Sequence, residues 1–449
     1  MPLVLPEIAA LDAAPDGVRI PPGVTVPLTP RVRALLDTDV VRRLARVSQL
    51  GLVGLVYPGA VHSRLEHSLG VYRLALEFLA RLGHDDRFAA AVGETDSAAF
   101  VAAALLHDVG HWPWCHPIED MGLPEIPRHE SLVRSLLGTG PAAAVLERDW
   151  SLDPGRVASL VEGTAADPAG RILTSLLSGP VDVDKMDYLA RDSLHAGVPY
   201  GRNFDQDRLL ASLCLDETGT ALAISHKGRT AAELLVFARY VMFSEVYWHH
   251  AVRTATAMLQ RAVWLVRDRL DVPRLVRSDD ASGAALLRAA AAGSPAEGLL
   301  DGLFGPTRRL WKRVASWDAA HPSGLHRALA GRPYAAMAAV SARLADLVSS
   351  RLGRPVPADA ILIDAPPAEK EVEFRLQVRE RPARETGSRG NPGPAWRRLE
   401  DVSPLVRSLA HEQFDDLVKR VRIFAAPEMA EAVASCDGLE ALVAQAAAS

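Results

Sequence analysis

The stretch Leu106-His107-Asp108-Val109-Gly110-His111 follows an uncharged, almost wholly apolar run at 98–106. Such a run predicts a buried helix, and the stretch places a histidine and an aspartate side by side at its polar end. A neutral imidazole and a carboxylate are good ligands for a divalent metal ion, and neighbouring ligands at one helix end can share an ion. The stretch therefore predicts a metal site in a helical protein.

Two other segments can complete such a site. His67 lies upstream in Glu66-His67-Ser68-Leu69-Gly70, and Asp184 lies downstream in Asp182-Val183-Asp184-Lys185. We predict that His67 begins one helix, that His107 and Asp108 end a second, and that Asp184 begins a third. Together the four side chains could supply two imidazoles and two carboxylates to one divalent ion, and Mn, Fe, Ni, Zn and Mg all remain open.

Histidines are concentrated around this stretch, since seven of the 14 lie between residues 62 and 129. A histidine paired with a carboxylate is the usual proton-transfer unit near neutral pH. The candidates for this role are His111, His116, Glu119 and His129. The alternative for His116 is an ordinary loop residue, and for His129 a residue at a helix start. Cys115, inside the cluster, is expected to be a packing residue rather than a ligand.

Two basic side chains adjoin the predicted ligands. Arg64 precedes His67 by three residues, and Lys185 follows Asp184 directly. Either alone would be read as a surface charge. A substrate with several phosphates needs several such groups, so beside the predicted ligands we interpret both as phosphate-binding candidates.

Helical spacing dominates the rest of the chain. Apolar residues at steps of three and four predict a helix from about 69 to 82, and two further stretches, 233–270 and 335–352, predict long helices. Short strands are predicted at 221–225, 360–364, 371–378 and 421–424. The fold class is therefore mainly α. Its parts would be an N-terminal segment (1–34), a core (35–270), a helical connector (271–354) and an α+β lobe (355–449) with a mobile loop at 379–398.

Charge and cysteine content limit the expected binding partners and the cellular compartment. The net charge of -5 argues against a dedicated binder of duplex DNA, so nucleic acid is a possible but not a favoured partner. The three cysteines, Cys115, Cys214 and Cys436, are far apart and odd in number, which disfavours a disulfide framework and favours the cytoplasm. We expect neither a signal peptide nor a membrane span.

The order of His67, His107-Asp108 and Asp184 resembles the H…HD…D pattern of the HD-domain metal-dependent phosphohydrolases. Three segments are similar to the deoxynucleoside triphosphate triphosphohydrolase (dNTPase) branch of that family: PGAVHSRLEHSLG at 58–70, HDVGHWPWCH at 107–116 and DVDKMDYLARDS at 182–193. The resemblance covers roughly residues 35 to 255, and ILIDAPP (361–367) and SPLVRSL (403–409) are similar to the C-terminal lobe of bacterial members. It implies an HD-domain helical bundle with a smaller C-terminal α+β lobe.

The resemblance also implies roles for individual residues. His67, His107, Asp108 and Asp184 would be the metal ligands, and His111, Glu119 and His129 a catalytic relay, with His116 near the scissile phosphate. The implied substrate contacts are Arg64, Lys185, Tyr188 and Arg239 at the phosphates, Gln49, Leu50 and Asp192 around the sugar, and Tyr247 near the base. Glu119 departs from the family, which usually has aspartate there. The segment at 37–44 keeps Asp37 and Arg43 of the family's D-T-P-x-x-Q-R-L motif but lacks its Pro and Gln.

The implied reaction is hydrolysis of a deoxynucleoside triphosphate (dNTP) to a deoxynucleoside and inorganic triphosphate, with metal-activated water attacking the α-phosphorus. By analogy we expect one divalent metal ion per active site and a homo-oligomer, either a dimer or a tetramer. Two alternatives stay open. One is an HD phosphohydrolase acting on another nucleotide, such as a monophosphate, a cyclic dinucleotide or a nucleic-acid end. The other is a nucleotide sensor that binds without turnover.

Overall fold

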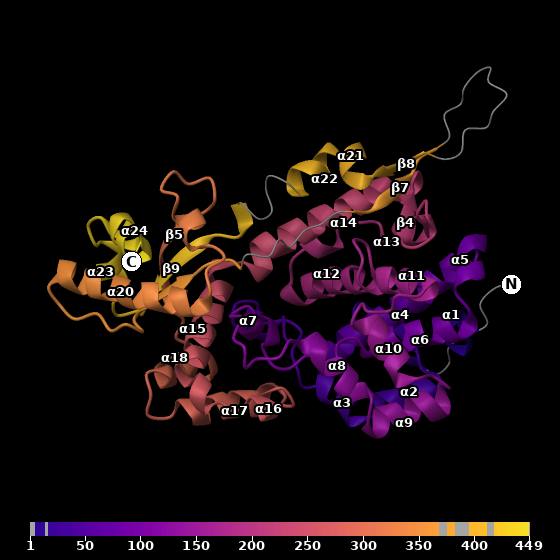
Figure 1. Ribbon diagram of the computed structural model, residues 1–449, viewed down its shortest axis with the longest axis horizontal. Coiled ribbons are helices and arrows are strands. Elements are labelled where there is room, and N and C mark those ends of the chain that lie inside the picture. The colour runs from indigo at the N-terminus through magenta and orange to yellow at the C-terminus, as the bar shows by residue number, and fades with distance from the viewer. Residues whose placement is uncertain (1–4, 14–16, 368–374, 382–394, 411–416, 449) are drawn as a thin grey trace, which may run out of the picture.

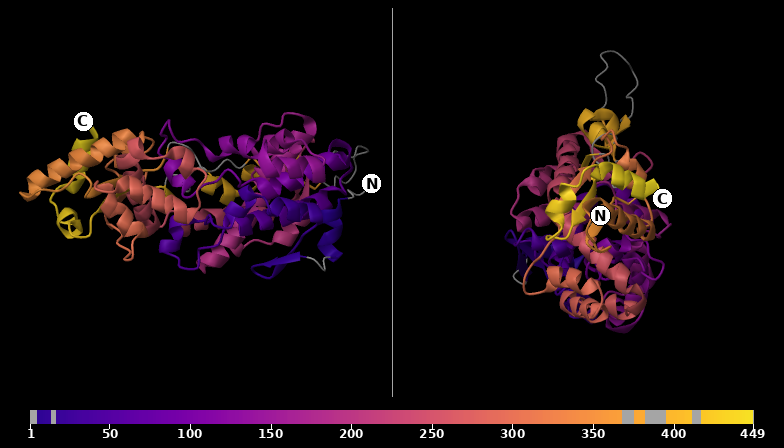
Figure 2. Two further views of the ribbon diagram at one scale, coloured as in Figure 1. Left: turned by 90° about the horizontal axis from the view of Figure 1, so that it is seen from below. Right: turned by 90° about the vertical axis from the view of Figure 1, so that its left-hand side faces the viewer.

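The computed structural model describes residues 5–13, 17–367, 375–381, 395–410 and 417–448. It is elongated, with a large helical body at one end and a smaller lobe at the other (Figures 1 and 2). Three helices form the centre of the body: α4 (Arg64–Leu82), α6 (Glu94–Leu106) and α12 (Val183–Ala196). Helix α4 packs against both α6 and α12, and this arrangement positions the candidate site.

Local sequence explains where these three helices begin and end. The Ser63 side chain caps α4 by accepting a hydrogen bond from the backbone N–H of Glu66. Asp182 caps α12 in the same way, and α12 ends at Gly197, whose φ of 71° is readily adopted only by glycine. Helix α6 is buried on all sides from Ser97 to Leu106, as expected for a helix that is apolar all round.

Shorter helices and a hairpin surround this centre. Strands β1 (Gly17–Ile20) and β2 (Val24–Pro27) pair antiparallel near the N-terminus. The other helices of the body are α1 (Pro6–Ala13), α2 (Pro30–Leu36), α3 (Asp39–Leu44), α5 (Asp86–Ala91), α7 (Cys115–Glu119), α8 (His129–Leu137), α9 (Gly140–Asp149), α10 (Pro154–Val161), α11 (Pro168–Leu177), α13 (Gln206–Ser212) and α14 (Arg229–Met242).

A four-stranded sheet joins the body to residues from near the C-terminus. Its order is β3 (Leu213–Leu215), β4 (Leu222–Ser225), β7 (Gln377–Arg379) and β8 (Trp396–Arg398), and β4 pairs with β7 in parallel. Helices α21 (Leu399–Val402) and α22 (Pro404–Ser408) follow β8. Val378, Leu399 and Val406 are buried in the same hydrophobic core as α4 and α6. Residues 376–379 and 396–409 therefore pack on the helical body, although they follow the first strand of the predicted C-terminal lobe.

The smaller lobe is built on an antiparallel sheet with the order β5 (Lys312–Trp317), β9 (Val421–Ala425) and β6 (Ile361–Asp364). Every residue of the central strand β9 is buried. The helices that pack around this sheet are α19 (Leu325–Leu329), α20 (Tyr334–Leu352), α23 (Ala430–Ala434) and α24 (Leu439–Ala448). The prediction of a mainly α fold with a smaller C-terminal α+β lobe is thus confirmed.

A third group of helices lies between the body and the lobe (Figure 1). Helix α15 (His250–Val266) packs on α17 (Asp280–Ala291) and α18 (Ala296–Phe304), with the short α16 (Val272–Leu275) between α15 and α17. Asp279 caps α17, and hydrogen bonds from Ser282 and Arg46 lower the pKa of its carboxyl to about 2. The helical stretch predicted at 233–270 is divided, since a π-helical segment at Phe243–Tyr247 separates α14 from α15.

The mobile loop predicted at 379–398 lies largely outside the described residues. Its described ends belong to β7 and β8, which pair antiparallel. Within the described ranges, no helix combines the length and the apolar character needed to cross a membrane.

Candidate active site

Three helix termini meet at the predicted metal ligands. His67 lies in the first turn of α4, His107 caps the C-terminus of α6, and Asp184 is the second residue of α12. The Nε2 atoms of His67 and His107 are 3.2 Å apart, and Asp184 Oδ1 lies 3.0 Å from the first and 3.8 Å from the second. These three side chains form a group that could hold one metal ion.

The hydrogen bonds behind the two imidazoles test whether a cation fits. His107 Nδ1 lies 2.9 Å from the carbonyl oxygen of Ala104, and His67 Nδ1 lies 2.8 Å from Asp187 Oδ2. Both Nδ1 atoms therefore donate, which leaves a lone pair on each Nε2. Two facing lone pairs beside a carboxylate repel one another unless positive charge lies between them. The donor set thus fits a divalent cation.

The pKa of His67 also indicates that this site favours positive charge. Burial lowers the pKa, but hydrogen bonds to Asp184 and Asp187 outweigh it and raise the pKa to about 10. A proton is therefore strongly favoured here when no metal ion is present. A divalent ion satisfies the same carboxylates with twice the charge and competes with that proton.

Asp108 lies beside this group, and most of its contacts are to other residues. Its Oδ1 is 3.4 Å from His107 Nε2 and 3.0 Å from His111 Nδ1, while Oδ2 accepts a hydrogen bond from Arg64 Nη1 at 3.0 Å. Burial raises the pKa of Asp108, but its electrostatic interactions with His111 and Arg64 hold the pKa well below its usual range. The carboxylate is ionised, and its role as a fourth ligand stays a prediction.

A buried ion network behind His67 was missed in the sequence. Asp187 accepts hydrogen bonds from Arg191 Nε at 2.8 Å and Nη2 at 2.7 Å, and Arg191 Nη1 reaches Glu66 at 2.7 Å. A Cβ on Gly70 would lie 1.9 Å from Asp187 Oδ1, so this close approach of α4 to α12 requires glycine. The available signal was spacing, because Asp187 follows Asp184 by three residues and shares its helix face.

The predicted relay residues are also brought together. The rings of His111 and His129 have centroids 3.8 Å apart, and His129 Nδ1 lies 2.9 Å from Glu119 Oε2. The longer side chain of Glu119 thus reaches the histidine. A Cβ on Gly110 would lie 2.2 Å from the His129 carbonyl oxygen, so glycine allows the turn after Asp108 to approach the start of α8.

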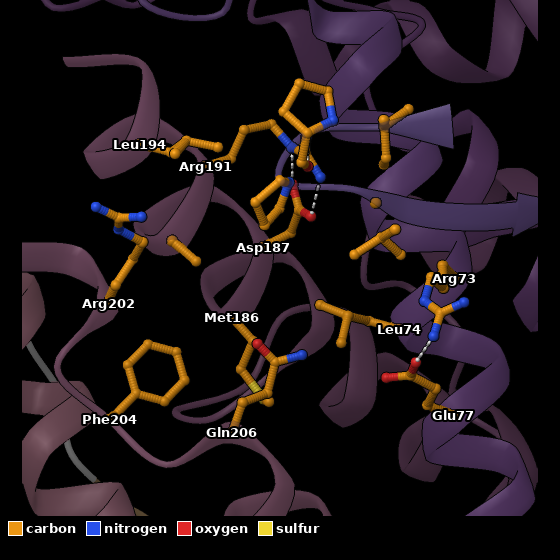
Figure 3. A pocket seen from close by; sticks show the side chains of 16 residues that line it. Arg73, Leu74, Glu77, Met186, Asp187, Arg191, Leu194, Arg202, Phe204 and Gln206 are labelled. Atoms are coloured by element: carbon orange, nitrogen blue, oxygen red, sulfur yellow. Dashed lines mark hydrogen bonds and ion pairs between the residues drawn. The ribbon is translucent and has the colours of Figure 1, made fainter. Parts of the chain in front are cut away.

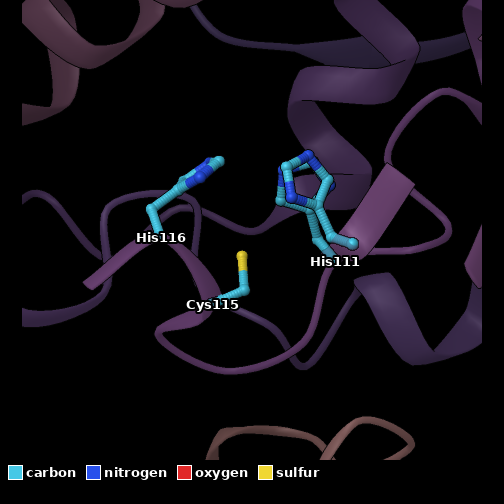
Figure 4. A group of neighbouring side chains, drawn as sticks. His111, Cys115 and His116 are labelled. Atoms are coloured by element: carbon cyan, nitrogen blue, oxygen red, sulfur yellow. The ribbon is translucent and has the colours of Figure 1, made fainter. Parts of the chain in front are cut away.

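His116 completes this cluster from the short helix α7, rather than from a loop. Its ring faces that of His111 (Figure 4), with centroids 5.1 Å apart, and its centroid lies 5.0 Å from that of His129. Enclosure by the surrounding protein, together with the charges of His129 and Arg64, lowers the pKa of His116. Its side chain is nevertheless 57% exposed, because it faces an open cavity. His116 is therefore a neutral imidazole near pH 7.

That cavity, of about 370 Å³, adjoins the candidate site. Gln49 and Leu50, which precede the 3₁₀ turn at Gly51–Leu55, line it together with Arg64 and Tyr247. Gln49 Oε1 and Arg64 Nε are buried and have no hydrogen-bond partner within the described parts of the chain. Two orphaned polar atoms at the wall of one cavity indicate a place for a polar ligand.

The remaining predicted substrate contacts form two groups. Tyr247 donates a hydrogen bond to Asp192 Oδ2 at 2.6 Å, so these two residues adjoin the cavity together. Lys185, Tyr188 and Arg239 do not line it. Burial raises the pKa of Tyr188, and the charges of Arg239 and Lys185 oppose that rise, so the three side chains lie near one another. Lys185 Nζ also contacts Asp182 at 2.7 Å.

Arg43, from the segment at 37–44, holds the backbone in place rather than facing the cavity. Its guanidinium donates hydrogen bonds to the carbonyl oxygens of Val109 at 2.6 Å, His111 at 2.7 Å and Ser278 at 3.3 Å. It thereby holds the turn that follows Asp108 against the residues just before α17.

A second cavity, of about 270 Å³, adjoins the ion network of Asp187 and Arg191 (Figure 3). Asp187 and Arg191 line it, with the Arg73–Glu77 ion pair and Phe204 nearby. None of the residues predicted to act in catalysis, metal binding or substrate binding lines this cavity. The chemistry-bearing side chains therefore favour the first cavity as the active site.

Comparison with known proteins identifies the segments. Residues 64–167 match the HD domain, and residues 204–440 match the HD associated region. An uncharacterized Bacillus subtilis protein, YwfO, is 35% identical over 230 residues, which are 51% of this chain and 50% of that protein. Human deoxynucleoside triphosphate triphosphohydrolase SAMHD1 is 28% identical over 279 residues, 55% of this chain and 44% of SAMHD1. The chain thus spans about half the length of the curated relatives it matches.

Solved structures show the same fold. A hypothetical protein from Aquifex aeolicus superposes with a TM-score of 0.68 at 24% identity, covering 92% of this chain and 97% of that one. A phosphohydrolase from Bacteroides thetaiotaomicron superposes with a TM-score of 0.65 at 20% identity, covering 91% and 99%. With its HD domain and its matched associated region, the chain belongs to the HD-domain family that carries the HD associated region.

Proposed function

We propose that this protein is a metal-dependent phosphohydrolase that converts dNTPs to deoxynucleosides and inorganic triphosphate. The observation that carries the proposal is the pair of Nε2 atoms on His67 and His107, which face each other and Asp184 while both Nδ1 atoms donate elsewhere. The likeness to SAMHD1, whose name states this activity, supports the choice of substrate.

His67, His107 and Asp184, with Asp108 beside them, would hold a divalent ion, which would make a water more acidic and neutralise phosphoryl oxygens. Arg64 supplies fixed positive charge next to that position. Its Nη1 is held by Asp108, and its orphaned Nε is available to a phosphate oxygen. We assign Lys185, Tyr188 and Arg239 to the outer phosphates, because the two cations and the tyrosine hydroxyl lie together near Asp184.

The histidine cluster would move the protons of the reaction. Glu119 accepts the Nδ1 hydrogen of His129, so Nε2 of His129 is a proton acceptor for the attacking water. As the new bond from water oxygen to the α-phosphorus forms, the bond from that phosphorus to the 5′-oxygen breaks. The leaving 5′-oxygen then needs a proton. We assign its delivery to His116, whose lowered pKa rises when polyphosphate charge enters the cavity.

The walls of the first cavity would recognise the deoxynucleoside. Both carboxylate oxygens of Asp192 are held, one by Tyr247 at 2.6 Å and one by His62 Nε2 at 3.0 Å, so its position is fixed. We assign Asp192 and Gln49 to the sugar hydroxyls and Leu50 to the apolar 2′ face. Tyr247 would then lie near the base.

The test is a product analysis with purified protein, each dNTP in turn, and Mn²⁺ or Mg²⁺. Chromatography should show a deoxynucleoside and triphosphate and no free monophosphate. His67→Gln should abolish turnover, whereas His84→Gln, just beyond the end of α4, should leave it intact. If no dNTP, alone or in a mixture, yields a deoxynucleoside, the substrate assignment is wrong. Turnover of a monophosphate, a cyclic dinucleotide or a nucleic-acid end would reassign the substrate.

We also propose that the protein assembles as a homo-oligomer, a dimer or a tetramer, by analogy with the dNTPase branch. Light scattering coupled to size-exclusion chromatography, with and without dNTPs, measures this directly. A monomer under both conditions would contradict the assignment.

A further inference from the structure

Cys115 has a position that its sequence context did not indicate. The side chain is buried at the start of α7, and its Sγ points into the gap between the rings of His111 and His116 (Figure 4). Cys115, His111, His116 and His129 each offer one ligand atom, and these four atoms all lie within 4.8 Å of one another. Packing alone does not explain why three imidazoles surround the sulfur of Cys115.

We propose that Cys115, His111, His116 and His129 form a second metal site, selective for a soft ion such as Zn²⁺. Cysteine thiolate and histidine imidazole are both ligands that zinc takes in four-coordinate sites, and here one thiolate and three imidazoles would supply all four. The group at His67, His107 and Asp184 offers only nitrogen and oxygen, so the two sites differ in the ions they prefer.

The geometry needs little adjustment. In a tetrahedral zinc site with bonds of about 2.0–2.3 Å, neighbouring ligand atoms are roughly 3.5 Å apart. Atoms that start at most 4.8 Å apart reach that separation by side-chain shifts of less than about 1 Å each. The turn after Asp108 is held by Arg43, and the start of α8 is held by the bond from the His129 backbone N–H to Glu119 at 2.7 Å, so the backbone frame is already set.

A carboxylate orients one of the imidazoles. Glu119 Oε2 lies 2.9 Å from His129 Nδ1 and accepts its hydrogen, which leaves Nε2 of His129 as the donor atom and is the support that metal-binding histidines usually have. Nδ1 of His111 lies 3.0 Å from Asp108 Oδ1, but it is buried and has no hydrogen-bond partner among the described residues.

The chemistry of binding balances without any co-reactant. Burial raises the pKa of the Cys115 thiol to about 12, so the thiol is protonated and unreactive in the metal-free protein. When the ion binds, a bond forms between sulfur and metal, and the thiol proton leaves to solvent. No atom is oxidised or reduced, and binding weakens as the pH falls.

Occupation of this site would inhibit the enzyme. The soft ion would use the Nε2 lone pair of His129 and engage His116, the groups assigned above to proton transfer. This consequence rests on the proposed function, whereas the binding itself does not. One metal would therefore activate at the first site, and another would inhibit at the second.

The test follows the thiolate-to-metal absorption band during titration of the full-length protein with Co²⁺ or Cd²⁺. Imidazole and carboxylate ligands give no such band, so the first site is silent. In the C214S/C436S double variant Cys115 is the only thiol, and a full band at one equivalent is expected. The two removed cysteines belong to no donor group in the described part of the chain.

Two variants complete the design. Cys115→Ser should lose the band, and its half-inhibitory Zn²⁺ concentration, measured against its own uninhibited rate, should rise at least tenfold, because even loss of a supporting group costs about 10–100-fold in metal affinity. His67→Gln should keep the band. If the double variant, folded by circular dichroism, shows no band, the inference is wrong. A band without dNTP turnover would instead refute the proposed function and leave the second site standing.

Discussion

Asp187 is the residue whose substitution tests the metal centre most directly. Its carboxylate accepts from His67 Nδ1 through Oδ2 and from Arg191 through both oxygens. In Asp187→Asn the amide keeps one acceptor oxygen and gains a donor group. If the oxygen takes the place of Oδ1, His67 loses its orienting acceptor. If it takes the place of Oδ2, it still accepts from His67 Nδ1 and Arg191 Nε, but the amide N–H groups face Nη2 of a buried cation.

The size of the effect follows from these contacts. Loss of a carboxylate behind a metal-ligating histidine costs about 10–100-fold in metal affinity, or roughly 1.4–2.7 kcal/mol. Breaking a buried ion pair costs about 3–5 kcal/mol of unfolding free energy when one charge is left alone. Because Glu66 still holds Arg191 Nη1 at 2.7 Å, we expect the lower end, about 3 kcal/mol.

The assay is calorimetric titration of metal-free protein with Mn²⁺, paired with thermal unfolding of the same samples. The matched control is Glu77→Gln on α4, which removes a carboxylate paired with Arg73 at 2.9 Å without touching His67. The control should bind Mn²⁺ like the wild type. If Asp187→Asn also binds Mn²⁺ with wild-type affinity, Asp187 does not orient His67, and our account of the facing Nε2 atoms fails.

Three further outcomes are expected. Arg43→Ala should lower the free energy of unfolding by about 3 kcal/mol in a urea titration, since charged hydrogen bonds to two backbone carbonyls within 2.7 Å are lost, while Arg42→Ala, at an exposed neighbour, should not. Gly110→Ala should cost about 1–3 kcal/mol and reduce dNTP turnover, whereas Gly298→Ala, inside α18, whose added carbon meets no atom within 4 Å, should do neither. Asp279→Ala should cost about 1 kcal/mol near pH 7 by removing the cap of α17.

The difference in unfolding free energy between the wild type and Asp279→Ala should shrink as the pH falls. A carboxyl with a lowered pKa stabilises the folded state above its unfolded pKa, and this contribution is lost as the pH falls through the folded value of about 2. The unfolding free energies of wild type and Asp279→Ala, measured from pH 7 to pH 2, should therefore converge at the acidic end. A constant difference over that range would contradict the assignment of the pKa.

Much of the site was readable because its parts lie at helix termini. An apolar run that ends in His107-Asp108 fixes where α6 stops, and Asp182 marks where α12 starts. Polar residues at such ends face the same interior space when the helices pack side by side. What the sequence did not show was the support behind the ligands, because Asp187 and Arg191 read as an ordinary helical ion pair until α4 and α12 are placed together.

Non-local pairing limited the prediction of the fold in the same way. The strands at 222–225, 361–364 and 421–425 were expected from their β-branched and apolar residues. Strand β5 was not, since it begins with exposed Lys312 and Arg313 and becomes a strand by pairing with β9. The break between α14 and α15 contains neither glycine nor proline. A π-helical turn makes this break instead, and its last residue, Tyr247, donates a hydrogen bond to Asp192.

The return of residues 376–379 and 396–409 to the helical body interleaves the chain. The polypeptide leaves the body after α14, builds most of the smaller lobe, comes back to add β7 and β8 beside β4, and leaves again to supply β9. No single cut therefore separates the two parts into independent units. A truncation after residue 354 would strip β4 of a parallel neighbour and uncover apolar side chains of the body. A single proteolytic nick, by contrast, should yield two fragments that copurify.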